Sequence, residues 1–110
     1  MTKKLILGGA LLASLMSSAA FAATDLSLWY HGAGNEVEKK IIDGIISDFN
    51  ASQADWAVKL EQFPQAAYND SVTAAALAGK LPDILDVDGP IMPNWAWAGY
   101  LAPLEVPAEA

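Results

Sequence analysis

The chain has 110 residues, with six lysines and no arginine against 13 acidic residues, and a formal net charge of −7. This balance argues against nucleic acid and anionic membrane surfaces as partners, because both attract clustered basic side chains. The lack of cysteine excludes disulfides, thiolate metal sites and a lipid-anchored lipoprotein.

Residues 1–22 have the pattern of a secretory signal peptide. A basic start at Lys3 precedes an apolar stretch, Leu5–Met16, and an A-x-A cleavage pattern ends at Ala22. The stretch is shorter than the ~20 residues of a spanning helix, which disfavours an uncleaved membrane anchor. We expect cleavage after Ala22 and a periplasmic mature chain, with four lysines against 13 acids and a net charge of −9.

A strand, a turn and a helix are predicted next. In residues 25–30, Leu26 and Leu28 share one face with Tyr30, opposite Trp29, which is a strand pattern. A glycine-containing turn over residues 31–34 follows. The helix predicted over about 36–51 begins at an Asn35 N-cap, with Glu38 as its capping-box partner. Its apolar residues recur at helical spacing: Val37, Ile41, Ile42, Ile45, Ile46 and Phe49.

The second half of the chain repeats this alternation. Strands are predicted over residues 56–63, ended by Pro64, and over 84–87. Helices are predicted over 68–78 and 90–97, with Gly79 and Gly99 after them, as suits helix C-termini. The order is βαβαβα, which favours an α/β fold with a parallel sheet and helices on its faces. Residues 23–110 are expected to form one structural unit.

The turn Gly32-Ala33-Gly34 is a G-x-G between a strand and a helix. A dinucleotide fingerprint would need a third glycine where Val37 stands, and acidic residues at the helix start would repel a phosphate. We therefore expect no nucleotide cofactor. The glycines are expected to make the turn and to let the backbone approach a ligand.

Three acids, Asp83, Asp86 and Asp88, surround the third predicted strand. Their spacing does not match a Ca²⁺-binding loop, so hydrogen bonds to sugar hydroxyls are the more favoured binding role. For Asp86 we expect a solvated strand end. For Asp88, ligand contact and a solvated strand end both stay open. His31, the only histidine, lies at a strand end, where a structural role and ligand contact are the alternatives.

The aromatic residues divide into core and cleft candidates. Trp95 shares a helical face with Ile91 and Ala98, which indicates core, whereas Trp97 lies on another face. Tyr68 opens the second predicted helix directly after a strand, a position that borders a cleft. Sugar rings stack on aromatic side chains and need polar partners for their hydroxyl groups, so such a mixture suits a sugar site.

Three segments carry a family resemblance: DLSLWY with its glycine turn and N-E helix start, AYNDSVTAAALAGKLPDIL, and NWAWAGYLAPL. Over nearly the whole mature chain, the sequence resembles the family 1 extracellular solute-binding proteins. These are the maltose-binding-protein-like receptors of ABC sugar importers. The resemblance implies a type II periplasmic-binding-protein-like fold of two α/β lobes that close around a solute. The connector pattern of residues 101–104 leads us to expect only the N-terminal part of the N-terminal lobe.

The resemblance also implies a function and a set of contacts. The chain would belong to a monomeric sugar receptor that docks on ABC permease subunits and carries no metal, cofactor or catalytic activity. The alternatives are a secreted carbohydrate-active hydrolase, with Glu36 and Asp88 as facing carboxylates, and a receptor of the same fold for a non-sugar solute. The implied sugar contacts are His31, Asn35, Glu36, Tyr68, Asn69, Asp70 and Asp88.

Overall fold

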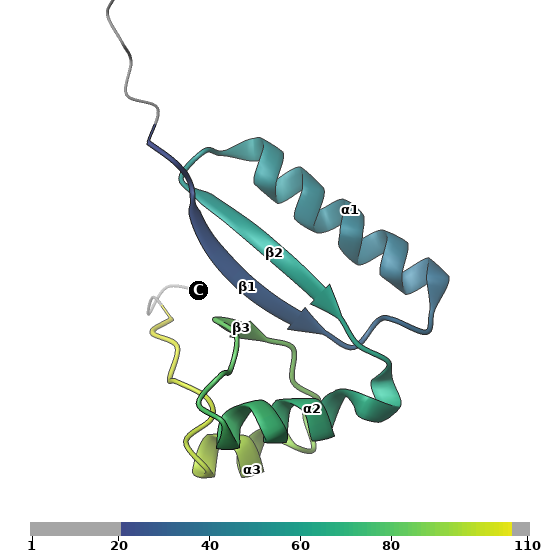
Figure 1. Ribbon diagram of the computed structural model, residues 1–110, viewed down its shortest axis with the longest axis vertical. Helices are drawn as coiled ribbons and strands as arrows, with labels where there is room; N and C mark the ends of the chain where they lie inside the picture. The colour runs from purple at the N-terminus through teal and green to yellow at the C-terminus, as the bar shows by residue number, and fades with distance from the viewer. Residues whose placement is uncertain (1–20, 107–110) are drawn as a thin grey trace, which may run out of the picture.

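The computed structural model describes residues 21–106, and within them the chain is α/β (Figure 1). The elements are, in order, β1 (Thr24–Tyr30), α1 (Glu36–Ser52), β2 (Trp56–Gln62), α2 (Gln65–Leu77), β3 (Ile84–Leu85) and α3 (Met92–Trp97). The predicted βαβαβα order is confirmed. Most of the predicted signal peptide, residues 1–20, lies outside the described residues. Among the helices of residues 21–106, none is long and apolar enough to cross a membrane.

The three strands form a parallel sheet in the order β2-β1-β3. Leu26 pairs with Val58 on one side of β1, and Leu28 pairs with Ile84 on the other. The chain thus moves outward from β1 to β2 and then crosses back to β3. The strand order reverses between β1 and β3, which makes that gap the topological switch point of the sheet.

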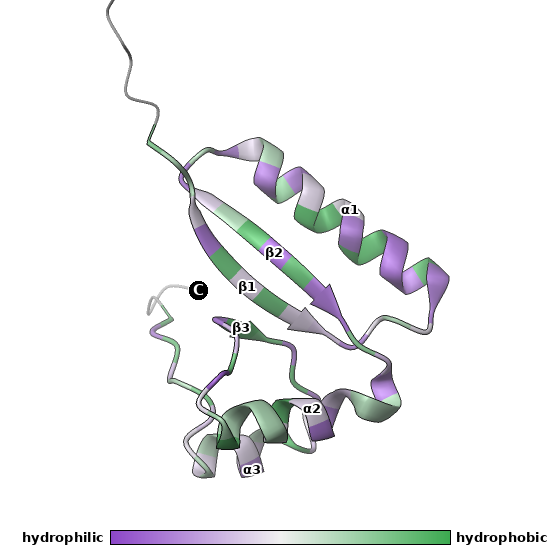
Figure 2. Ribbon diagram, in the orientation of Figure 1, coloured by the Kyte–Doolittle hydropathy of each residue, from purple (hydrophilic) through white to green (hydrophobic). Residues whose placement is uncertain are grey.

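The two faces of the sheet are covered by different helices. Tyr30 contacts Glu38 of α1, and the neighbouring Trp29 packs with Phe63 and Tyr68 on the opposite face. The predicted alternation of β1 is confirmed, and Figure 2 shows hydropathy alternating along β1 and β2. The main core lies on the α2–α3 side, where Tyr68, Val72 and Trp95 are buried together. The prediction that Trp95 belongs to the core is confirmed.

Capping residues fix where the helices begin and end. The Asn35 side chain accepts from the N–H groups of Val37 and Glu38 at the start of α1, as predicted. Gly79 and Gly99 follow α2 and α3 with φ of 65° and 77°. At both sites one N–H bonds three residues back and the next N–H bonds five residues back, the pattern of a Schellman motif. The two glycines therefore end their helices in a conformation that disfavours other residues.

Three predicted boundaries differ from the structure by more than one residue. Helix α2 starts at Gln65 rather than Tyr68, because Pro64 supplies an extended residue directly before the first turn. Strand β3 ends at Leu85 rather than Val87. Asp86 makes the last backbone bond to β1, at the Trp29 carbonyl. Helix α3 starts at Met92 rather than residue 90, because residues 89–91 form a turn in which the Asp88 carbonyl accepts from Ile91 and Met92.

Candidate functional site

A polar cluster lies at the carboxyl ends of β1 and β3 and is centred on His31. Its imidazole Nδ1 pairs with a carboxylate oxygen of Asp86, which follows β3. The other ring nitrogen, Nε2, lies 3.8 Å from Oε1 of Glu38 in the first turn of α1. The His31 side chain is only 17% exposed. One imidazole thus joins the β1–α1 loop, helix α1 and the segment after β3.

Glu38 and Tyr30 complete the α1 side of the cluster. The Tyr30 hydroxyl donates to Oε1 of Glu38 at 2.7 Å, and the Tyr30 ring stacks on His31 with centroids 4.6 Å apart. This hydrogen bond, together with burial and the nearby carboxylates, raises the pKa of Tyr30 to about 12. Tyr30 therefore stays a protonated donor at neutral pH. Glu38 does not close the predicted capping box, because the Asn35 N–H donates to the Gly32 carbonyl instead.

Tyr68 links the carboxyl ends of β1 and β3 through its hydroxyl group, next to the polar cluster. Its hydroxyl lies 3.0 Å from the carbonyl oxygen of Trp29 and 2.8 Å from that of Asp86, so its proton bridges the ends of the two strands. Tyr68 is 4% exposed, and its ring centroid is 6.0 Å from that of His31. Burial, followed by the Asp86 charge, raises the pKa of Tyr68 to about 12. Its main role in the structure is to hold the two strand ends at a fixed spacing.

Gly32 is buried against side chains of β1 and β2. A Cβ atom at this position would lie 2.5 Å from Oε1 of Gln62 and 3.1 Å from the Tyr30 ring. A side chain at this position would require the end of the Gln62 side chain to move and the Tyr30 ring to shift slightly. The turn is joined to the chain just after β2 by the Ala33 N–H, which donates to the Phe63 carbonyl at 3.0 Å.

The remaining residues implied by the family resemblance lie around this cluster at exposed positions. Asn35 and Glu36 are exposed at the start of α1, and Asp88 is exposed after β3. Asn69 and Asp70 are exposed on α2, next to the buried Tyr68. The structure brings His31 and Tyr68 together. Ligand contact by any of these seven residues remains a prediction.

Sequence reasoning missed three members of the cluster. The expectation that Asp86 is a solvated strand end is wrong, because its carboxylate pairs with His31. Glu38 was assigned to a cap, and Tyr30 only to a strand face. A usable signal was present for Asp86: His31 and Asp86 each come directly after a strand, and the ends of β1 and β3 are adjacent in this strand order.

Asp83 has a separate structural role at the other end of β3. Its carboxylate accepts from both the N–H and the hydroxyl of Ser27 at 2.8 Å, and its own N–H donates to the Ser27 hydroxyl at 2.9 Å. These bonds hold the pKa of Asp83 below its ordinary value. Asp83 thereby fixes the register between β1 and the short β3.

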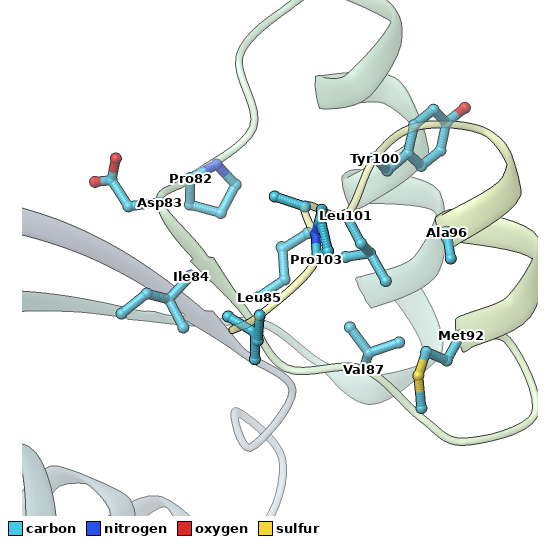
Figure 3. Close-up of a pocket in the computed structure, with 12 residues that line it drawn as sticks. Pro82, Asp83, Ile84, Leu85, Val87, Met92, Ala96, Tyr100, Leu101 and Pro103 are labelled. Atoms are coloured by element: carbon cyan, nitrogen blue, oxygen red, sulfur yellow. The ribbon is translucent and has the colours of Figure 1, made fainter. Parts of the chain in front are cut away.

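A cavity of about 690 Å³ lies on the outer side of β3 and is distinct from the polar cluster (Figure 3). Its walls come from Leu85 and Val87 beside β3, Met92 and Ala96 of α3, and Leu101 and Pro103 beyond α3. The lining is mainly apolar, and its one carboxylate, Asp83, is already bonded to Ser27. Such a space suits apolar groups rather than a ligand rich in hydroxyl groups.

Within residues 21–106, no group of three or more His, Asp or Glu side chains is arranged to hold a metal ion. Comparison with known proteins found no matching family model, no matching curated protein and no matching solved structure.

Proposed function

We propose that this chain is the first part of the N-terminal lobe of a periplasmic receptor that captures a sugar for an ABC importer. The proposal joins the sequence resemblance to the α/β architecture and to the polar cluster. The receptor binds its solute without chemical conversion and needs no cofactor. The complete receptor has a second lobe, and the ligand site lies between the two.

The observation that carries the proposal is the position of the His31–Asp86 pair. Open α/β sheets bind ligands outside the carboxyl ends of their strands, at the point where strand order reverses. In the order β2-β1-β3, this point is between β1 and β3. His31 follows β1, and Asp86 follows β3. This polar cluster therefore coincides with the place where this class of sheet binds ligands.

The chemistry of the cluster fits a polyhydroxyl ligand. An ionised carboxylate has about four acceptor positions, so Glu38 and Asp86 retain capacity after binding protein groups. The exposed side chains of Asn35, Glu36 and Asp88 add acceptors and a donor around them. Hydrogen bonds from sugar hydroxyls to carboxylates are charge-assisted and stronger than neutral ones. The Tyr30–His31 stack supplies the aromatic component.

The mechanism follows from two-lobe closure. Open and closed forms interconvert, and the ligand favours the closed form by the contacts that it makes only there. Rigid placement of His31 matters in this scheme because the lobe must present its donors and acceptors in one geometry. The clamp from Tyr68 to the Trp29 and Asp86 carbonyls provides that rigidity. The closed form then docks on the permease subunits.

Calorimetric titration of the complete two-lobe receptor that contains this chain, against glucose, maltose, xylose and longer oligosaccharides, tests the proposal. Loss of a carboxylate that accepts sugar hydroxyls should cost about 1.5–3 kcal/mol, a roughly ten- to hundredfold rise in Kd. We expect this for Asp86→Asn, Glu36→Gln and Asp88→Asn. Asp48→Asn, exposed on α1 outside the cluster, serves as the control. Sugar binding that all three site variants leave unchanged, with normal circular dichroism, would refute the placement of the site.

A second test concerns export. N-terminal sequencing of periplasmic material should give Ala23 as the first residue. A chain that retains Met1 in the membrane fraction would contradict the assignment to the periplasm. A reducing-sugar assay on the full-length protein separates a receptor from a hydrolase, since only the hydrolase releases new reducing ends.

A further inference from the structure

The first half of the outer edge of β2 is covered by side chains from the end of α1 and from its C-cap. The edge can be defined from the hydrogen bonds between the strands. Thr24 N–H donates to the Asp55 carbonyl, and Phe63 N–H donates to the Tyr30 carbonyl. Odd-numbered residues of this segment therefore face β1. Because backbone groups alternate along a strand, the even-numbered residues of β2 turn their N–H and C=O groups outward.

The first two of these outward residues are each bonded by one side-chain amide. Asn50 accepts from the Val58 N–H at 2.7 Å and donates to the Val58 carbonyl at 2.9 Å. Gln53 accepts from the Trp56 N–H at 2.8 Å and donates to the Trp56 carbonyl at 2.7 Å. Each amide supplies one acceptor and one donor to the same residue. That is the pair of groups that a neighbouring strand would supply.

We propose that the amides of Asn50 and Gln53 close the first half of the β2 edge against strand addition by a second chain. An uncovered edge strand is a template for pairing, and native proteins cover or interrupt such edges. Asn50 lies in the last turn of α1 and Gln53 is its C-cap. The helix that covers one face of the sheet thus also reaches around its edge.

The test compares the wild-type chain with Asn50→Ala, Gln53→Ala and the double variant. Amide hydrogen exchange followed by NMR should show Val58 exchanging several-fold faster in Asn50→Ala, with Trp56 unchanged, and the reverse in Gln53→Ala. Light scattering after size exclusion should give one mass for wild type at all concentrations. The double variant should give a mass that rises with concentration. Asp48→Ala, at an exposed position of the same helix, should behave as wild type.

A folded double variant whose mass stays that of a monomer at every concentration would overturn the proposal. So would single variants in which Val58 and Trp56 stay as protected as in wild type. If the double variant does not fold, the single variants decide, since each leaves the other amide in place. Their association is read by the same scattering experiment, in the presence of a synthetic peptide of residues 56–62. Only the variants should bind the peptide, and equal binding by wild type would also overturn the proposal.

Discussion

On the side of the sheet that α2 and α3 cover, Tyr68, Val72 and Trp95 are buried together, whereas α1 on the other side has no buried residue. The α1 side is joined to the sheet largely by side-chain hydrogen bonds. They run from Asn50 to Val58, from Gln62 to Asp43 and from Tyr30 to Glu38. Apolar burial is therefore greatest on the α2–α3 side. On the α1 side the sheet residue Val58 is buried, and directed polar contacts position the helix.

The outer face of α1 also carries apolar residues that are poorly buried. Val37, Ile41, Ile45 and Phe49 form a stripe along the helix and are between 42% and 71% exposed. Figure 2 shows apolar positions spread along α1 between polar ones. A helix with apolar residues on two faces exceeds what a single contact with the sheet can bury. The comparison predicts that substitutions on the two sides of the sheet will have very different effects on stability.

The largest effect is expected at Trp95. It is 4% exposed in the α2–α3 core, while Trp97 of the same helix is 94% exposed. Removing a buried Trp side chain should cost about 3–5 kcal/mol, because apolar burial is lost and a cavity remains. Urea unfolding of Trp95→Ala should therefore show a large loss of stability or no folded state. Trp97→Ala is the matched control and should unfold as wild type does. Equal effects of the two variants would contradict the assignment of this core.

The second-largest loss of stability is expected at Tyr68, whose hydroxyl contacts two backbone carbonyls at the edge of the apolar core. Tyr68→Phe keeps the ring but removes the donor shared by the Trp29 and Asp86 carbonyls. The Trp29 carbonyl keeps its bond from the Asp86 N–H, but the Asp86 carbonyl loses its donor, which should cost about 1–3 kcal/mol. Chemical denaturation measures the loss. Tyr100→Phe is the control, because Tyr100 is a partly buried tyrosine that packs against the same core. A neutral Tyr68→Phe would show that the strand ends hold their spacing without the clamp.

A smaller, pH-dependent effect is expected at Asp83. Its pKa is lowered mainly by the Ser27 N–H and then by the Ser27 hydroxyl. A lowered pKa means that ionised Asp83 stabilises the fold above its unfolded pKa of about 3.9. That contribution is lost as the pH falls through the folded pKa. Thermal melts should therefore show Asp83→Asn less stable than wild type at neutral pH, with the difference shrinking below about pH 4. A difference that persists unchanged in acid would assign the effect to packing rather than charge.

Local sequence patterns predicted much of this fold. The features that they missed depend on contacts between residues far apart in the sequence. The Asn35 cap, the Gly79 and Gly99 helix ends and the two faces of β1 are encoded within a few residues, so sequence patterns reveal them. The His31–Asp86 pair joins residues 55 positions apart. It depends on β3 pairing with β1, and no local pattern reports that register. The implied contacts at Asn69, Asp70 and Asp88 depend on a ligand and stay predictions.

The smallest effect is expected on the outer stripe of α1, and it gives the sharpest test of the comparison. Ile45 is 56% exposed, whereas its neighbour Ile46 is partly buried. Gln has a helix propensity at least as good as Ile, so Ile45→Gln should change stability by no more than about 0.5 kcal/mol. Ile46→Gln should cost about 1 kcal/mol or more, because it places an amide in a partly apolar contact. Urea melts of the two variants measure the difference. If Ile45→Gln is as destabilising as Ile46→Gln, the stripe is covered in solution, and α1 is held by apolar burial on both faces.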